Sequence, residues 1–362
     1  MADGALSLTD TLKRAVEALR AGRLDEAARQ CKSALKTRPD SFDALHLMGL
    51  IEARRGDYRE AERLIGRAVK ANPRVAAAHL NLGNAQAALG RHGDALASYD
   101  RALALKPDYA EAINNRGTSL HALRKLDEAA GCFQRALALK PDYAGAHNNL
   151  GNVLKDQGKL DSAAAALRKA IELRPGYADA YGNLGDVLLG QDRPAEAAAI
   201  YRRMAELEPG EPGPLDRLGT AFYADENFAE AIGAYGRALD LRARKVQASD
   251  RVRAICAGLI GLIDVPQIPD SDAAAVAARR RFAQGLAELT ELAAGLGEPA
   301  SAAEQGLLTG AAFKVNNFAL GYHLEDDTRL QRDYAALLTR LFKPRLGDFL
   351  KPIEKRRRDG KI

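Results

Sequence analysis

The amino-acid sequence predicts an all-α protein, with about seven helix-turn-helix repeats followed by a non-repeat helical region. Glycine, proline and alanine each recur with a step of 34 residues over most of the chain, and all three share one register. A fixed period of this length is typical of solenoids, in which each unit buries its core only against its neighbours. The members are Gly49, Gly83, Gly117, Gly151, Gly185 and Gly219; Pro39, Pro73, Pro107, Pro141, Pro175 and Pro209; and Ala27, Ala61, Ala95, Ala129, Ala163, Ala197 and Ala231.

Each series has a mechanical reason. Glycine in the first helix and alanine in the second leave no bulk, so the two helices of a unit can cross closely. Larger side chains recur in the second helix, and we expect them to fill the core: Tyr99, Phe133, Tyr201 and Tyr235. Proline ends the second helix because it lacks an N–H and disfavours a helical residue before it. Asp25, Asp127 and Asp161 stand where we expect a side-chain oxygen to cap the second helix.

The pattern N-L-G…G…A…[FY]…A…P at this period resembles the tetratricopeptide repeat (TPR) family. The resemblance covers residues 8–243, after an N-terminal extension over residues 1–7. It implies a right-handed superhelix whose first helices line a concave groove that holds protein or extended peptide segments. The seventh unit has Ala243 in place of proline, so we expect its second helix to run on. The units start near Leu8, Phe42, Ala76, Ala110, Ala144, Ala178 and Pro212.

In the first helices, asparagine recurs at fixed positions that the general repeat pattern does not require. One position is Asn in four successive units, and a second position, three residues later on the same helical face, is Asn in two. Because a carboxamide both donates and accepts hydrogen bonds, such a ladder can hold a polypeptide backbone of any sequence. The alternative is that these side chains only tie one repeat to the next. The predicted peptide-binding residues are Asn81, Asn115, Asn149, Asn183, Asn84 and Asn152, and the flanking units carry Leu47 and Arg217.

No metal site or cofactor site is predicted. His79 and His147 share a repeat position but are two units apart, so we interpret them as packing residues. Three widely spaced cysteines indicate neither a disulfide framework nor a zinc site and suit a reducing, cytoplasmic setting. The sequence has no G-x-G-x-x-G, no G-x-x-x-x-G-K-[ST] and no alternating strand–helix pattern, so this chain contains no catalytic residue that we can identify.

The net charge of +5 lies in the last twenty residues. From Lys343 onward, eight basic residues face three acidic ones, so the preceding 342 residues are formally neutral. No specific nucleic-acid binding is therefore predicted, and residues 343–362 are interpreted as a solvated basic tail, with an acidic-surface contact as a weaker option. The longest apolar run, Ala254–Ile263, is about half the ~20 residues that a membrane span needs.

Residues 244–342 keep a helical pattern but lose the 34-residue period, and they are interpreted as a helical linker or cap. Within them, Asn317-Phe-Ala-Leu-Gly-Tyr-His323 followed by Glu325-Asp-Asp327 and Leu330-Gln-Arg resembles the segment that precedes the catalytic domain in bacterial O-GlcNAc-transferase-like, SPINDLY-type glycosyltransferases. The resemblance implies an acceptor-recruiting region of a UDP-GlcNAc-dependent protein glycosyltransferase whose catalytic domain is absent from this chain. The alternative is a stand-alone TPR adaptor for the assembly of protein complexes.

Overall fold

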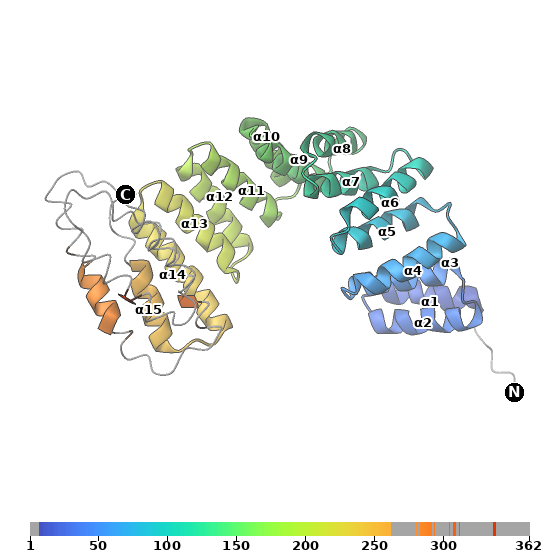
Figure 1. The fold of residues 1–362 in the computed structure, drawn as a ribbon, viewed down its shortest axis with the longest axis horizontal. Coiled ribbons are helices and arrows are strands. Elements are labelled where there is room, and N and C mark those ends of the chain that lie inside the picture. Colours follow the sequence, from blue (N-terminus) through green and yellow to red (C-terminus); the bar gives the residue numbers. More distant parts are fainter. Residues whose placement is uncertain are drawn as a thin grey trace, which may run out of the picture. The chain divides into compact units, whose positions relative to one another are not determined.

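The computed structural model describes residues 7–261 and short stretches further on, namely 280, 283–291, 293, 304, 307–308, 311 and 336–337. The residues so described contain fifteen numbered α-helices and no β-strand (Figure 1). The predicted fold class, an α-solenoid of about seven helix pairs, is confirmed. The predicted features from Asn317 to Arg332 and the tail over residues 343–362 lie outside the described residues.

The helices alternate between the first and the second member of each repeat. The first helices are α1 (Leu8–Arg20), α3 (Phe42–Arg54), α5 (Ala76–Ala88), α7 (Ala110–Ala122), α9 (Ala144–Asp156), α11 (Ala178–Gly190) and α13 (Pro212–Ala224). The second helices are α2 (Leu24–Thr37), α4 (Tyr58–Ala71), α6 (His92–Leu105), α8 (Leu126–Leu139), α10 (Leu160–Leu173), α12 (Pro194–Leu207) and α14 (Phe228–Lys245). A further helix, α15 (Asp250–Gly261), follows. None of the described helices is both long enough and apolar enough to cross a membrane.

The chain forms two compact units, Met1–Asn183 and Leu184–Ile362. In the first unit each helix from α1 to α10 packs against the next, and the first helices α1, α3, α5, α7 and α9 also contact one another in that order. In the second unit α12 packs against α13, α13 against α14, and α14 against α15.

The core of each repeat forms where its first helix meets a large side chain of its second helix. A Cβ built on Gly83 would lie 2.5 Å from Cε1 of Tyr99, and one built on Gly117 would lie 2.8 Å from Cε1 of Phe133. Both aromatic side chains are buried, as are the alanines of the repeating series. The predicted core role of the aromatic series is confirmed, and glycine is needed at these points because the neighbouring ring occupies the space of its missing side chain.

The predicted aspartate caps are wrong. The second helices α2, α8 and α10 begin one residue before Asp25, Asp127 and Asp161, and their N-cap residues make no side-chain hydrogen bond. A carboxylate inside the first turn still interacts favourably with the positive end of the helix dipole. Two of these side chains also reach the following repeat: Asp25 pairs with Arg55, and Asp127 Oδ1 accepts a 2.8 Å hydrogen bond from Gln157.

The ends of the second helices follow the proline pattern. Helix α2 ends two residues before Pro39, and α4 ends two residues before Pro73. Helix α14, which has Ala243 where earlier repeats have proline, continues to Lys245 and has 18 residues, against 14 in the other second helices. The prediction that this helix runs on is confirmed.

Arginine side chains tie the end of one repeat to the next. Nη2 of Arg67 donates to the carbonyl of Pro39 at 2.9 Å, and Nη2 of Arg135 donates to the carbonyl of Pro107 at 2.6 Å. In the same direction, Nη1 of Arg54 donates to the carbonyl of Leu19 at 2.9 Å. Pro39 and Pro107 lie just beyond helix ends, so the two arginine bonds satisfy carbonyl groups that would otherwise rely on water.

The glycine contact gives a test with a matched control. We expect Gly83→Ala to lower the free energy of unfolding by about 1–2 kcal/mol, because overpacking against Tyr99 outweighs the better helix propensity of alanine. Gly131→Ala, in the exposed middle of α8 with no heavy atom within 4 Å of the added Cβ, should instead raise it by about 0.8–1.0 kcal/mol. Urea denaturation followed by circular dichroism measures both, and equal effects would contradict the proposed contact.

Candidate polypeptide-binding surface

The six predicted asparagines lie on four successive first helices. Asn81 and Asn84 belong to α5, Asn115 to α7, Asn149 and Asn152 to α9, and Asn183 to α11. All six side chains are half-buried. We call the surface formed by these six side chains the amide face.

Each repeat of the amide face is hydrogen-bonded to the repeat before it. Nδ2 of Asn115 donates to Oδ1 of Asn84 at 2.8 Å. In the next two steps, Nδ2 of Asn149 donates to Oδ1 of Asn114 at 3.1 Å, and Nδ2 of Asn183 donates to Oδ1 of Asn148 at 2.9 Å. The inter-repeat tie, one of the two interpretations of the sequence, is therefore present. A carboxamide has two N–H donors and an acceptor oxygen, so one such bond leaves capacity for a ligand, and peptide binding stays a prediction.

Asn114 and Asn148 belong to this network but were missed by the sequence analysis. Both are buried, with exposed fractions of 6% and 5%. Asn114 donates to Oδ1 of Asn115 at 3.0 Å and accepts from Asn149, which satisfies both ends of its carboxamide. The signal that could have found them is the doublet Asn-Asn, which occurs at residues 114–115 and again at residues 148–149.

Asn84 and Asn152 occupy the same repeat position but differ in their partners. Oδ1 of Asn84 accepts from the Tyr99 hydroxyl at 3.0 Å and also from Asn115. The residue equivalent to Tyr99 in the repeat of Asn152 is Leu167, which has no hydroxyl. Oδ1 of Asn152 is shielded from solvent and has no hydrogen-bond partner in the described part of the chain.

The amide face begins at a histidine. Nδ2 of Asn81 donates to Nε2 of His46 on α3 at 2.9 Å, which requires a neutral ring with its proton on Nδ1. Burial lowers the pKa of His46, and this outweighs the opposing charge of Asp43. The neutral form that accepts from Asn81 is therefore the favoured one.

A charged cluster lies at the C-terminal ends of the first helices α7 and α9. Nε2 of His121 lies 2.9 Å from Oδ2 of Asp156, and Nη1 of Arg124 lies 2.8 Å from the same oxygen. Burial raises the pKa of Asp156, but the hydrogen bonds and charges of His121 and Arg124 outweigh it and hold that pKa below its usual value. This cluster is a further tie between successive repeats.

The first helices of the first two repeats present a different surface. A cavity of about 530 Å³ lies between α1 and α3, and its apolar lining comes from Leu12, Val16, Leu47 and Leu50. Leu47 occupies the repeat position that is asparagine in the four units that follow. This repeat position thus changes from leucine in the second repeat to asparagine in the third to sixth repeats.

The two histidines interpreted as packing residues both bind backbone. Nε2 of His79 lies 2.9 Å from the carbonyl of Pro73, and Nε2 of His147 lies 2.9 Å from the carbonyl of Pro141. Each ring therefore donates to the proline carbonyl at the end of the preceding repeat. Within the described ranges, no group of three or more His, Cys, Asp or Glu side chains could hold a metal ion.

These repeats and their packing define a helical-repeat scaffold. The chain belongs to the tetratricopeptide repeat family, whose model matches residues 12–58, 46–110, 114–176 and 149–212, more than half of the chain. Repeats of this kind build extended surfaces that bind proteins and peptides. No curated protein matches the chain.

Several solved structures are similar to this chain. A TPR protein from Parabacteroides merdae ATCC 43184 is 19% identical, with a TM-score of 0.54, over 65% of this chain and 93% of that one. MamA is 30% identical, with a TM-score of 0.41, over 45% of this chain and 95% of MamA. YrrB, described as a TPR protein with an unusual peptide-binding site, is 24% identical, with a TM-score of 0.42, over 51% of this chain and 95% of YrrB.

The contrast between Asn84 and Asn152 yields a paired prediction. Asn84→Ala should lower the free energy of unfolding by about 1–3 kcal/mol, because it leaves the buried Tyr99 hydroxyl and an amide of Asn115 without their acceptor. Asn152→Ala should change it by no more than about 0.5 kcal/mol, because its oxygen has no partner to lose. Chemical denaturation of both variants measures the difference, and an equal loss would show that Asn152 is also a structural tie.

The pKa of His46 predicts a pH effect on stability. Its pKa is lower in the folded chain than the value of about 6.5 in the unfolded chain, so the unfolded state binds more protons as the pH falls. The contribution of neutral His46 is present above pH ~6.5 and is lost as the pH drops towards the folded pKa. His46→Asn supplies the residue found at the equivalent positions 114 and 148, and it should reduce the fall in melting temperature between pH 7 and pH 5. An unchanged fall in the variant would contradict this assignment.

Proposed function

We propose that the amide face binds an extended segment of another protein through the backbone of that segment. The carboxamides recur at the repeat step on successive first helices, so they match a ligand that is itself periodic and polar along its length. Their remaining donors and acceptors pair with peptide C=O and N–H groups. Binding of this kind does not depend on the side chains of the ligand. The observation that carries the proposal is the regular row of half-buried carboxamides, in which each inter-repeat bond uses only part of the hydrogen-bonding capacity of its donor.

The apolar cavity between α1 and α3 supports the same proposal. A ligand bound only through its backbone has no fixed register, whereas an apolar side chain in this cavity would set one. The four lining residues Leu12, Val16, Leu47 and Leu50 supply the apolar contact. Burial of apolar surface contributes roughly 25 cal/mol per Å², so a single anchoring side chain adds materially to the hydrogen bonds of the amide face.

We further propose that this binding recruits acceptor proteins to an O-GlcNAc-transferase-like catalytic domain. The support is the segment from Asn317 to Arg332 with its resemblance to such glycosyltransferases. The scaffold would then act by raising the local concentration of acceptor near the catalytic site. The mass of the endogenous protein, detected with an antibody to the repeats, tests this role. A mass well above 38.9 kDa is expected, whereas a mass of 38.9 kDa would favour a stand-alone adaptor.

Replacement of the ladder residues tests peptide binding itself. The triple variant Asn115→Ala, Asn149→Ala, Asn183→Ala should bind a pool of random, fluorescein-labelled 15-residue peptides at least tenfold more weakly, because it removes three backbone contacts. Asn152→Ala alone should weaken binding several-fold. Fluorescence anisotropy, recorded below the melting temperature of every variant, measures the affinities.

The matched control for these variants is Gln134→Ala. It removes an exposed carboxamide from the second helix α8, away from the amide face, and should leave the affinity unchanged. If the triple variant keeps the affinity of the unaltered chain, the amide face is only an inter-repeat tie and the proposal fails.

A further inference from the structure

The second helices of the first two repeats carry an excess of positive charge. Residues 29–39 and 63–73, which cover the later parts of α2 and α4, contain four and three basic residues and no acidic one. The net charge of the equivalent stretch is +2 or less in every later repeat. The excess therefore belongs to these two repeats and is not part of the general repeat pattern. Its members are Arg29, Lys32, Lys36, Arg38, Arg63, Arg67 and Lys70.

Four of the cations on these two helices have no carboxylate partner in the described part of the chain. Arg63 pairs with Glu60, and Arg67 pairs with Asp40, so those two charges are compensated. The other four are exposed, and no ion pair joins them to a described side chain. We call the surface that they form the basic face: Arg29, Lys32, Lys36 and Lys70.

The acidic residues of α2 are already paired with other cations. Asp25, one turn before Arg29, pairs with Arg55 of the next repeat. Its neighbour Glu26 pairs with Arg23. The part of the basic face on α2 is therefore not neutralised by its own helix.

The acidic residues at the start of α4 do not neutralise the basic face either. Glu62 pairs with Arg91 of the third repeat. Asp57 is the N-cap of α4 and accepts a hydrogen bond from the first turn of that helix. It precedes Lys70 by 13 residues, which is about 20 Å along a helix axis.

The two parts of the basic face lie close together. Nη2 of Arg67 on α4 donates to the carbonyl of Pro39 at 2.9 Å, and Pro39 follows directly after the end of α2. One arginine side chain therefore spans the gap between the two helices. Residues spaced by three and four positions share one face of a helix, and such a spacing joins the three cations of α2 over about 10 Å: Arg29, Lys32 and Lys36.

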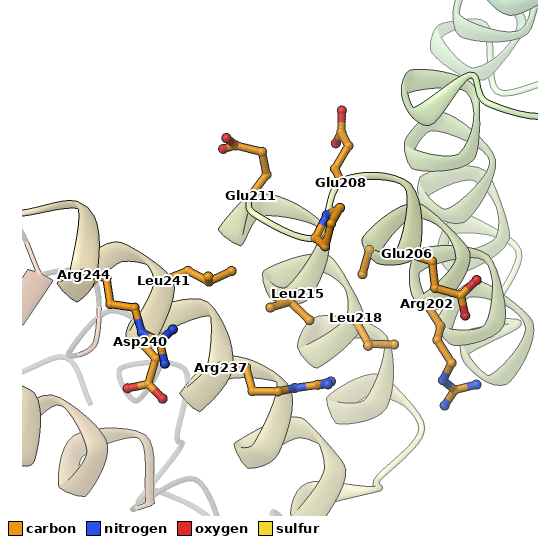
Figure 2. Close-up of a pocket in the computed structure, with 12 residues that line it drawn as sticks. Arg202, Glu206, Glu208, Glu211, Leu215, Leu218, Arg237, Asp240, Leu241 and Arg244 are labelled. Carbon is orange, nitrogen blue, oxygen red and sulfur yellow. The ribbon is translucent and has the colours of Figure 1, made fainter.

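A groove in the second unit carries charges of both signs and offers a surface for comparison. It has a volume of about 470 Å³ and is lined by residues of α12, α13 and α14 (Figure 2). Figure 2 shows Glu206 beside Arg202, and Asp240 beside Arg244. The lining contains four carboxylates and three arginines, so this groove has no excess of positive charge: Glu206, Glu208, Glu211, Asp240, Arg202, Arg237 and Arg244.

We propose that the basic face docks an acidic segment of a partner protein. Ammonium and guanidinium groups form charge-assisted hydrogen bonds with carboxylates, which stabilise the complex with such a segment. A basic segment is rejected, because like charges would be brought together on docking. This surface lies on second helices, whereas the amide face lies on first helices, so the two sites are separate and take ligands of different chemistry.

The side chains of the basic face favour a protein segment over other anionic partners. The large apolar side chains that are exposed among the described residues are Tyr58, Leu123, Leu139 and Val246, and none of them belongs to this face. Stable attachment to a bilayer requires an apolar or lipid anchor beside the charges, and single-stranded nucleic acids stack their bases on aromatic side chains. A nucleic-acid duplex is held through many phosphate contacts. A short acidic segment, in contrast, needs only as many carboxylates as there are cations on the face.

The test is a selection of displayed random 12-residue peptides on the full chain, with counter-selection against the triple variant Arg29→Gln, Lys32→Gln, Lys36→Gln. Glutamine has nearly the helix propensity of lysine and arginine, so the variant should keep its melting temperature. The basic residues 343–362 are present in both chains, so peptides that bind them are removed. Enriched peptides are expected to contain more Asp and Glu than Lys and Arg. If no peptide is enriched, or if the enriched peptides are neutral or basic, the proposal is overturned.

Affinities of the selected peptides supply the second part of the test. Anisotropy titration should show at least tenfold weaker binding by the triple glutamine variant, and binding by the unaltered chain should weaken as salt is added. The matched control Arg202→Gln, Arg237→Gln, Arg244→Gln removes three positive charges from the groove of the second unit and should leave the affinity unchanged. An equal loss in both variants would mean that only the net charge matters, which overturns the assignment.

Other anionic probes separate the possible sources of negative charge. Binding of a 15-base-pair DNA duplex and of phosphatidylserine vesicles should change less than twofold on the triple glutamine substitution. A tenfold loss with either probe would show that the face recognises phosphate groups and would overturn the proposal. The triple asparagine variant of the amide face should bind the selected peptides as tightly as the unaltered chain, so the two sites are tested independently.

Discussion

The close crossing of the two helices within each repeat is the constraint on which the other features depend. Where the first helix has glycine, the facing Tyr, Phe, Leu or Ile side chain of the second helix lies within van der Waals reach of its backbone. This contact fixes the crossing angle between the two helices of a repeat. The next repeat must then fit against the surface that these two helices form. Because interiors are close-packed, an error of one methyl group at such a crossing is felt by the neighbouring repeat. The positions of the amide-face residues are therefore set by contacts that bind no ligand.

Polar groups on the first helices hold successive repeats together. Half-buried carboxamides generally need hydrogen-bond partners, and in three successive repeats an amide N–H finds an acceptor on the preceding repeat. The donor of each of these bonds recurs at the 34-residue step of the repeats. A repeat that slipped out of register would therefore lose its hydrogen bonds to the preceding repeat.

The sequence predicted the fold well because the 34-residue period appears in three residue types at once. Gly83 and Tyr99 could be assigned to the core from spacing alone, and the extension of α14 followed from the absence of a proline at Ala243. The start of the second helices was predicted wrongly at Asp25, since the residue type suits both the cap and the first turn. Spacing could not distinguish a binding asparagine from a tying one, because both uses require the same helical face.

The partnerless oxygen of Asn152 was missed for a different reason. It is associated with Leu167, which occupies a position that is tyrosine in three other repeats. Only an alignment of the repeats to one another reveals that difference.

The arginine ties between repeats bear on how the chain is made. Arg67 and Arg135 each donate to a proline carbonyl 28 residues earlier, and Arg54 reaches back to Leu19 in the same way. The acceptor therefore leaves the ribosome before its donor, so a newly made repeat is completed only when the next one has emerged. Assembly of the array then proceeds in the direction of translation, and each repeat is fastened by its successor as synthesis continues.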